Sequence, residues 1–180
     1  MTNAYVDAVT KTVDVNGTAF VYRETGEKNG VPVVLLHHLT AVLDDWDPRT
    51  IHDLAQEHRV IAFNNRGVGA SKGATSDTID DMATDAVAFI RALGLTKTDL
   101  LGFSLGGFIA QVIAQKHPDL VRRIILAGTS TAAARESATW TPCCRTPWPG
   151  QQPRRSIRSS RSFSPSLMTA RRRLPNFSSV

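Results

Sequence analysis

One serine in this 180-residue sequence stands where a nucleophile could work. Ser104 lies between Gly102 and Gly106 in a Gly-x-Ser-x-Gly sequence, after an apolar run and before an apolar helical pattern. A sharp strand-to-helix corner of this kind lifts the serine hydroxyl off the end of a sheet. The N–H of the next residue, Leu105, could then stabilise a developing oxyanion. We interpret Ser104 as a catalytic nucleophile; the alternative is an inert serine in a buried corner.

A serine nucleophile also needs a base, and an acid that orients the base. After Ser104 the sequence holds one histidine, His117, and two acids, Asp119 and Glu136. His117 should end the helix that Ser104 begins, which places it about 18 Å away at 1.5 Å per residue. It cannot be the base. We therefore expect the chain as printed to be impaired or inactive as an enzyme.

The remaining histidines precede Ser104. His37 and His38 follow an apolar run, and we interpret them as structural histidines bonded to loop backbone. A makeshift base is the alternative for this pair. His52 and His58 are expected to be solvated residues near helix ends. The N–H of Leu39, in the same loop as His37 and His38, would be the second oxyanion donor beside that of Leu105.

The elements that must position Ser104 can be predicted from hydrophobic periodicity. Alternating residues at 8–15 and 18–24 flank Asn16-Gly17, a strong signal for an antiparallel hairpin. Four later runs are apolar without alternation, as in strands covered on both faces: residues 31–36, 60–63, 100–103 and 124–127. Helical patterns separate them, a short one after Trp46, one from Thr78 to Gly94 and one from Ser104 to His117. This alternation predicts an α/β domain with a parallel sheet.

Several of these segments together resemble the first half of the α/β-hydrolase fold enzymes. The segments are the hairpin, residues 35–38, 65–71, 102–107 and 126–129, in that order and spacing. The resemblance is greatest to small bacterial esterases, lactonases and cofactor-free haloperoxidases, and it covers about residues 8–130. One departure is His38, which stands where the family usually has glycine.

The resemblance implies a serine hydrolase that acts on a small ester, lactone or related acyl substrate, with Ser104 as nucleophile and without a metal or organic cofactor. It implies an α/β-hydrolase core of an N-terminal hairpin and about four parallel strands, with the C-terminal strands of the fold missing. By resemblance, the acid and the histidine of the triad belong to loops after later strands, which the sequence does not contain. Strand 124–127 would then be an uncovered sheet edge, so we expect poor solubility or partial order.

The composition changes at residue 132. Residues 137–180 contain eight arginines, six of the nine prolines and no acidic residue. Since the whole chain has a net charge of +5, residues 1–136 have a net charge of 5 − 8 = −3. We predict a partial hydrolase domain over residues 1–131 and an Arg/Ser/Pro-rich tail without ordered structure over 132–180. Our hypothesis is a shift of reading frame near codons 130 to 140; a natural basic tail is the alternative.

That tail supports a second function, in which a non-catalytic α/β module presents its arginines to nucleic acid or to an anionic surface. Sparse aromatic residues in the tail, and the lack of a nucleic-acid-binding fold before it, argue against nucleic acid. Gly67, Gly69 and Gly73 deviate by one residue from a dinucleotide-binding spacing, so we do not predict a nucleotide. Without a membrane span or a signal-like start the expected location is cytoplasmic, and Cys143 and Cys144 are expected to be reduced and incidental. The sequence does not predict an oligomeric state.

Overall fold

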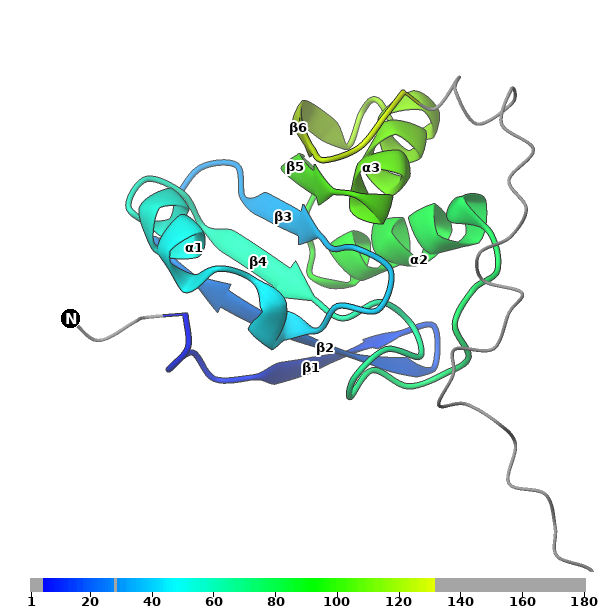
Figure 1. The fold of residues 1–180 in the computed structure, drawn as a ribbon, viewed down its shortest axis with the longest axis horizontal. Coiled ribbons are helices and arrows are strands. Elements are labelled where there is room, and N and C mark those ends of the chain that lie inside the picture. The colour runs from blue at the N-terminus through cyan, green and yellow to red at the C-terminus, as the bar shows by residue number, and fades with distance from the viewer. Residues whose placement is uncertain (1–4, 28, 132–180) are drawn as a thin grey trace, which may run out of the picture. The chain divides into compact units, whose positions relative to one another are not determined.

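The computed structural model describes residues 5–27 and 29–131, which form a six-stranded sheet and three α-helices (Figure 1). The strands are β1 (Lys11–Val15), β2 (Thr18–Thr25), β3 (Val33–Leu36), β4 (Val60–Phe63), β5 (Thr98–Phe103) and β6 (Val121–Ala127). The helices are α1 (Pro48–Ala55), α2 (Ile79–Ala92) and α3 (Leu105–Lys116), and a short 3₁₀ turn, η1, spans Leu43–Asp45. The sequence prediction for residues 132–180 lies outside the described residues.

The strand order is β1-β2-β4-β3-β5-β6. β1 and β2 form the expected antiparallel hairpin, whose turn holds Asn16 at φ 52° and Gly17 at φ 79°, as a two-residue turn of this kind requires. β2 pairs antiparallel with β4, and β3 to β6 are joined by parallel pairs. The predicted hairpin and four parallel strands are therefore confirmed.

Two strands begin earlier than their apolar runs indicate. β5 begins at Thr98 and β6 at Val121, so β5 starts with Thr98 and Asp99, and β6 contains Arg122 and Arg123 before its apolar run. Three of these polar side chains have partners: Thr98 donates to the carbonyl of Pro32, and the Asp99 carboxylate accepts two hydrogen bonds from the Arg122 guanidinium. A paired polar group can be buried in a sheet, whereas hydrophobic periodicity alone marks only the apolar part of the strand.

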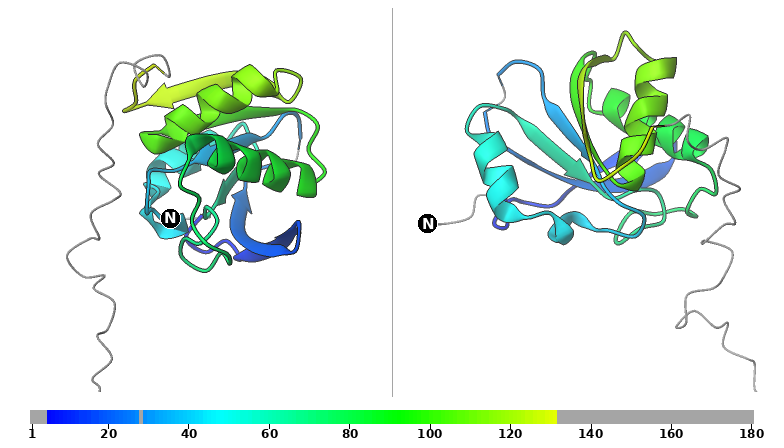
Figure 2. Two further views of the ribbon diagram at one scale, coloured as in Figure 1. Left: turned by 90° about the vertical axis from the view of Figure 1, so that its right-hand side faces the viewer. Right: turned by 45° about the horizontal axis from the view of Figure 1, so that its top comes forward.

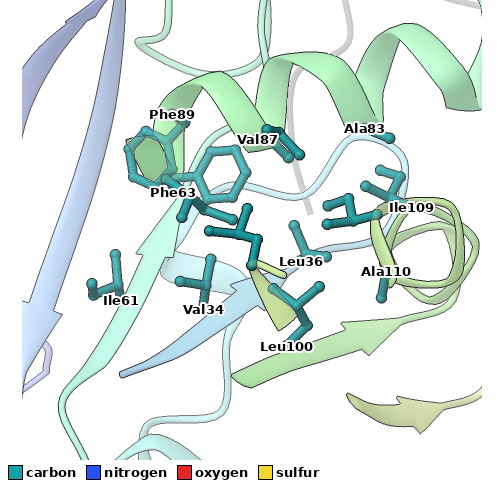
Figure 3. Packing of buried hydrophobic residues seen from close by; sticks show 14 of the residues in the cluster. Val34, Leu36, Ile61, Phe63, Ala83, Val87, Phe89, Leu100, Ile109 and Ala110 are labelled. Atoms are coloured by element: carbon teal, nitrogen blue, oxygen red, sulfur yellow. The ribbon is translucent and has the colours of Figure 1, made fainter. Parts of the chain in front are cut away.

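Helices cover the sheet on two faces. α2 and α3 pack on one face, against alternate residues of the central strands such as Val34 and Leu36 (Figure 3). On the same face the rings of Phe63 and Phe89 stack, with 4.2 Å between their centroids. α1 and η1 pack on the other face, against residues that include Val33. All four residues of β3 are buried, which explains its continuous apolar sequence.

β6 is the last strand of the sheet, and no described element lies beyond it (Figure 2). Ile124, Ile125 and Leu126 keep 39%, 50% and 42% of their surface exposed, whereas the central β3 is buried throughout. The uncovered edge expected from the sequence is thus present in the described part of the chain. No described helix is long and apolar enough to cross a membrane.

Candidate active site

Ser104 occupies the single residue between β5 and α3. Its backbone adopts φ 53° and ψ −115°, one of two positive-φ positions that a described non-glycine residue occupies. The corner is held by two backbone hydrogen bonds of 2.9 Å, from the Ser104 N–H to the Ala127 carbonyl and from the Gly107 N–H to the Ser104 carbonyl. The Ser104 hydroxyl makes no hydrogen bond to another described residue. The side chain is half-buried and stands at the N-terminus of α3, where helix dipole and free N–H groups favour negative charge.

Two glycines allow this corner to pack closely. A Cβ at Gly102 would overlap the backbone of Gly106 and Gly107, and a Cβ at Gly106 would overlap the carbonyl group of Leu36. The first turn of α3 therefore rests directly on the backbone of β5 and on the end of β3. The Gly-x-Ser-x-Gly spacing has a steric cause in this structure, because neither position has room for a side chain.

The loop after β3 reaches the same edge of the sheet as Ser104. β3 and β5 are parallel neighbours with Leu36 opposite Gly102, so the residues after both strands emerge together. Leu39 lies in the turn that follows β3 and is 42% exposed. Leu105 is the first residue of α3, so its N–H has no acceptor within the helix. Both candidate oxyanion donors thus belong to segments that meet at one edge.

His37 is a buried neutral histidine. Its ring is 4% exposed and packs on Trp46 with 4.3 Å between ring centroids. Burial, together with the neighbouring charge of His38, lowers the pKa of His37 to about 4. Its Nδ1 accepts the N–H of His38 at 2.9 Å, so the proton of the neutral ring is assigned to Nε2. This bond to loop backbone agrees with the structural interpretation of His37.

Among the described residues, no base is joined to Ser104 by a hydrogen bond or an ion pair. His117 follows the last residue of α3, at the opposite end of the helix from Ser104, as expected. His38 contacts the ring of Phe103, the neighbour of Ser104, at a centroid distance of 5.8 Å. The buried Asp99 lies at the N-terminal end of β5, bound to Arg122, and so stands at the wrong edge of the sheet. Within the described part of the chain, Ser104 has candidate oxyanion donors but no assigned acid–base pair.

Sequence reasoning missed a buried polar network that fixes the neighbouring loops. Asn64 is 4% exposed and accepts the N–H of Leu43 at 2.9 Å. Ser71 is 5% exposed, donates to the Asn64 carbonyl and accepts the N–H of Val21. The only signal in the sequence was a cluster of short polar residues directly after a buried strand. Such residues satisfy loop backbone groups that would otherwise be buried without partners.

The glycine-rich loop after β4 contains one arginine, Arg66, whose charge is paired. The Arg66 guanidinium donates two hydrogen bonds to Asp85, at 2.8 and 2.7 Å, and a third to Thr18. Helix α2 begins only at Ile79, so the glycines do not lead directly into a helix N-terminus. Among the described residues, no group of three or more His, Cys, Asp or Glu side chains could hold a metal ion.

Comparisons with known proteins identify a family whose fold agrees with the one described above. Residues 31–149 match the family model described as alpha/beta hydrolase fold. The non-heme chloroperoxidase of Streptomyces lividans is 34% identical over 113 residues, which cover 62% of this chain and 41% of that protein. The serine hydrolase BPHL of Homo sapiens is 30% identical over 130 residues, covering 70% of this chain and 45% of that protein.

Solved structures give the same result. An alpha/beta hydrolase fold protein from Chitinophaga pinensis has a TM-score of 0.67 and 43% identity, over 68% of this chain and 44% of that chain. Est816, described as an N-acyl homoserine lactone degrading enzyme, has a TM-score of 0.61 and 30% identity, over 72% of this chain and 49% of that chain. The chain spans less than half the length of each of these four proteins.

Proposed function

Because the chain belongs to the alpha/beta hydrolase fold family, we propose that Ser104 is the nucleophile of a serine hydrolase for small esters, lactones or related acyl compounds. The observation that carries the proposal is the backbone of Ser104, held at φ 53° between β5 and α3. A non-glycine residue in this region costs about 1–3 kcal/mol, and such strain persists where the surrounding structure fixes it, often at functional sites. The serine hydrolase among the similar proteins supports the type of reaction, and the lactone-degrading enzyme supports a lactone as one kind of substrate.

In the proposed reaction the Ser104 hydroxyl attacks the carbonyl carbon of the substrate. The hydroxyl proton passes to solvent water, and the carbonyl oxygen becomes an oxyanion that the N–H groups of Leu39 and Leu105 stabilise. The oxyanion then collapses, the carbon–oxygen bond to the leaving group breaks, and the departing alkoxide takes up a proton from water to become the alcohol, so that an acyl-serine remains. Water attacks the acyl-serine, which releases the carboxylic acid and restores Ser104.

The chain as printed should carry out this reaction poorly. A base that takes the serine proton contributes typically 10²–10⁴-fold to such a rate, and none is assigned near Ser104 among the described residues. Oxyanion donors and substrate binding alone still accelerate acyl transfer over water by about 10³–10⁴-fold. We therefore expect slow acylation of Ser104 by activated esters, far below ordinary enzymatic turnover.

The test is incubation of the full 180-residue chain with p-nitrophenyl acetate, followed by mass spectrometry of its peptides. We expect acetyl transfer to Ser104, its loss in Ser104→Ala, and an unchanged adduct in the control Ser130→Ala, which removes an exposed serine beyond β6. Absence of a Ser104 adduct would refute the proposal. Turnover of 1–10³ s⁻¹, usual for enzymes, would refute impairment.

The alternative, that the arginine-rich tail binds nucleic acid or anionic surfaces, concerns residues 132–180, which lie outside the described residues. It stays a prediction from composition. Its check is a salt titration of binding to random-sequence DNA and to anionic vesicles, because binding through eight arginines would weaken steeply with salt.

A further inference from the structure

Three buried side-chain polar atoms have no hydrogen-bond partner among the described residues. They are Nε2 of His37, Nε1 of Trp46 and Oγ1 of Thr129. The rings of His37 and Trp46 pack together in the loop after β3, and Thr129 lies in the segment after β6. Both segments follow strands that pair with β5, the strand that leads to Ser104. Buried polar groups are ordinarily paired, so each exception calls for an explanation, such as a part in catalysis.

The Thr129 side chain lies against the helix that Ser104 begins. β6 ends at Ala127, whose carbonyl accepts the N–H of Ser104 at 2.9 Å. Gly128 then adopts φ 58°, a conformation that favours glycine, and the chain turns towards α3. A Cβ at Gly107 would come within 2.6 Å of Thr129 Cβ and 2.8 Å of its Oγ1. Thr129 therefore contacts the first turn of α3, three residues after Ser104.

Other groups than the Thr129 hydroxyl hold this segment in place. Gln111 lies one helical turn after Gly107 in α3. Its side-chain amide donates to the Gly107 carbonyl at 3.1 Å and to the Ser130 carbonyl at 2.9 Å, which joins the segment to the helix. The position of the Thr129 hydroxyl is thus fixed by its neighbours, while Oγ1 itself takes no part in the hydrogen bonds of the described residues.

The end of β3 and the segment after β6 contact different sides of the first turn of α3. Gly106 lies against the end of β3, and Gly107 lies against Thr129. β5 stands between β3 and β6 in the sheet, so Ser104 stands between the two segments. A substrate carbonyl oxygen bound to the N–H of Leu39, in the loop after β3, would turn the other two substituents of the carbonyl carbon away from that loop. Those substituents are the acyl carbon and the leaving oxygen.

We propose that the Thr129 hydroxyl donates a hydrogen bond to the leaving oxygen of an ester or lactone bound at Ser104. The inference rests on the proposed function, because it needs Ser104 to attack an acyl carbon. The acyl carbon is apolar, whereas the leaving oxygen can accept a hydrogen bond. That oxygen gains negative charge as its bond to carbon breaks, so the hydrogen bond is strongest in the transition state. The Thr129 O–H bond stays intact, and the leaving oxygen takes its proton from water.

Thr129→Val is the central variant, because valine has the shape of threonine without the hydroxyl. An unpartnered buried hydroxyl costs free energy in folding, and a methyl group in its place removes that cost. We therefore expect the melting temperature of Thr129→Val to equal or exceed that of the unmodified chain. A melting temperature lowered by more than about 4 °C, the shift that one lost hydrogen bond gives in a domain of this size, would show a structural partner and overturn the proposal.

The kinetic test compares three acetate esters whose leaving oxygens differ in basicity: p-nitrophenyl, p-chlorophenyl and phenyl acetate, in increasing order. Each ester is mixed with the full 180-residue chain, and the Ser104 adduct is followed in time by mass spectrometry. A more basic leaving oxygen carries more localised charge and gains more from a hydrogen bond. We expect Thr129→Val to slow acylation by phenyl acetate at least about tenfold, but by p-nitrophenyl acetate less than about threefold. Thr129→Ser, which keeps the hydroxyl, should restore the rates.

Thr12→Val is the matched control, since Thr12 is an exposed threonine of β1, at the other end of the strand order. It should leave the three rates unchanged. Equal slowing with every ester in Thr129→Val would indicate a general disturbance of the corner and would overturn the proposal. Failure of Thr129→Ser to restore the rates would do the same.

The same experiment separates this inference from the proposed function. If the unmodified chain forms the Ser104 adduct and Thr129→Val forms it at the same rates, the proposed function stands and the role of Thr129 is refuted. If none of the three esters gives a Ser104 adduct, the proposed function is refuted, and the role of Thr129 is refuted with it.

Discussion

Ser104 stores conformational strain in the folded chain, because φ 53° with ψ −115° suits glycine and few other residues. Ser104→Gly should therefore raise the free energy of unfolding above that of Ser104→Ala by about 1 kcal/mol, although both lack the hydroxyl. Alanine is the matched control, since it keeps the Cβ that causes the strain. Guanidinium unfolding of the two variants measures the difference. Equal stabilities would show that the corner is not strained.

His37 should make stability depend on pH in a defined window. Burial lowers its pKa from 6.5 to about 4 in the folded chain. Above pH 6.5 the ring is neutral in both states and has no effect. Between pH 6.5 and about 4 the unfolded chain binds a proton that the folded chain does not. The free energy of unfolding should then fall as pH drops, by at most about 1.4 kcal/mol for each pH unit.

Urea unfolding between pH 7 and 5 tests this dependence. His37→Gln should flatten the slope, while His52→Gln, at an exposed position of α1, should leave it unchanged. The window excludes Glu24: burial acts to raise its pKa, but hydrogen bonds from Lys11 and Arg59 outweigh burial and lower it to about 2. The stability that the Glu24 carboxylate gives the folded chain is lost only as the pH falls below about 4.5, the ordinary pKa of this group. An unchanged slope in His37→Gln would contradict the assignment.

At the scale of single residues, the sequence predicts which side chain is a candidate nucleophile better than it predicts which polar side chains are buried. Ser104 could be identified because its neighbours have a fixed spacing and the flanking segments have opposite periodicities. The buried state of His37 depends on Trp46, nine residues later in another turn, and no local pattern reports that contact. The same holds for Asn64 and Ser71, whose partners lie in η1 and β2.

At the scale of elements, the contact between α3 and the end of β3 is the tightest constraint on the site. Gly106 lies within α3, where alanine would ordinarily favour the helix by about 1 kcal/mol. A Cβ there would overlap the Leu36 carbonyl, so Gly106→Ala should lower the free energy of unfolding by more than about 2 kcal/mol. Thermal unfolding followed by circular dichroism measures this.

Gly30→Ala is the control for Gly106→Ala. Gly30 has φ 74° but no atom within 4 Å of an added Cβ, so only backbone strain of about 1 kcal/mol is expected. If Gly106→Ala were no more destabilising than Gly30→Ala, α3 could move away from β3 at little cost. The close packing beneath Ser104 would then not fix the corner.

The elements themselves were predictable because most of them follow one periodicity. The hairpin turn at Asn16-Gly17, the cap of α2 at Thr78 and the end of α3 at His117 are local signals, and all three agree with the structure. The early starts of β5 and β6 were not predictable. Their polar residues find partners in other strands, as Asp99 does in Arg122, 23 residues later in the sequence, and no local pattern reports such a pair.

For the molecule as a whole, the open edge at β6 should govern solubility. Ile125→Lys places a charge on the uncovered face, and charged residues on edges oppose pairing between molecules. We expect a higher soluble concentration and less light scattering at a given concentration than for the unmodified chain. Val9→Lys adds the same charge far from β6, before the strand at the opposite edge of the sheet, and should change little. Equal gains from both variants would attribute the effect to net charge rather than to the edge.

The strand order also limits the sequence in which the parallel strands can pair during folding. β3 lies between β4, the next strand along the chain, and β5, which begins 62 residues after β3 ends. A nascent chain can pair β3 with β4 early, but the other side of β3 stays open until α2 and β5 have been made. Such distant pairings are slow to form, because a long loop must close before any contact is gained. Each new parallel strand therefore pairs with the open edge of an earlier one, and among the described strands the outer edge of β6 is the one that stays open at this end of the sheet.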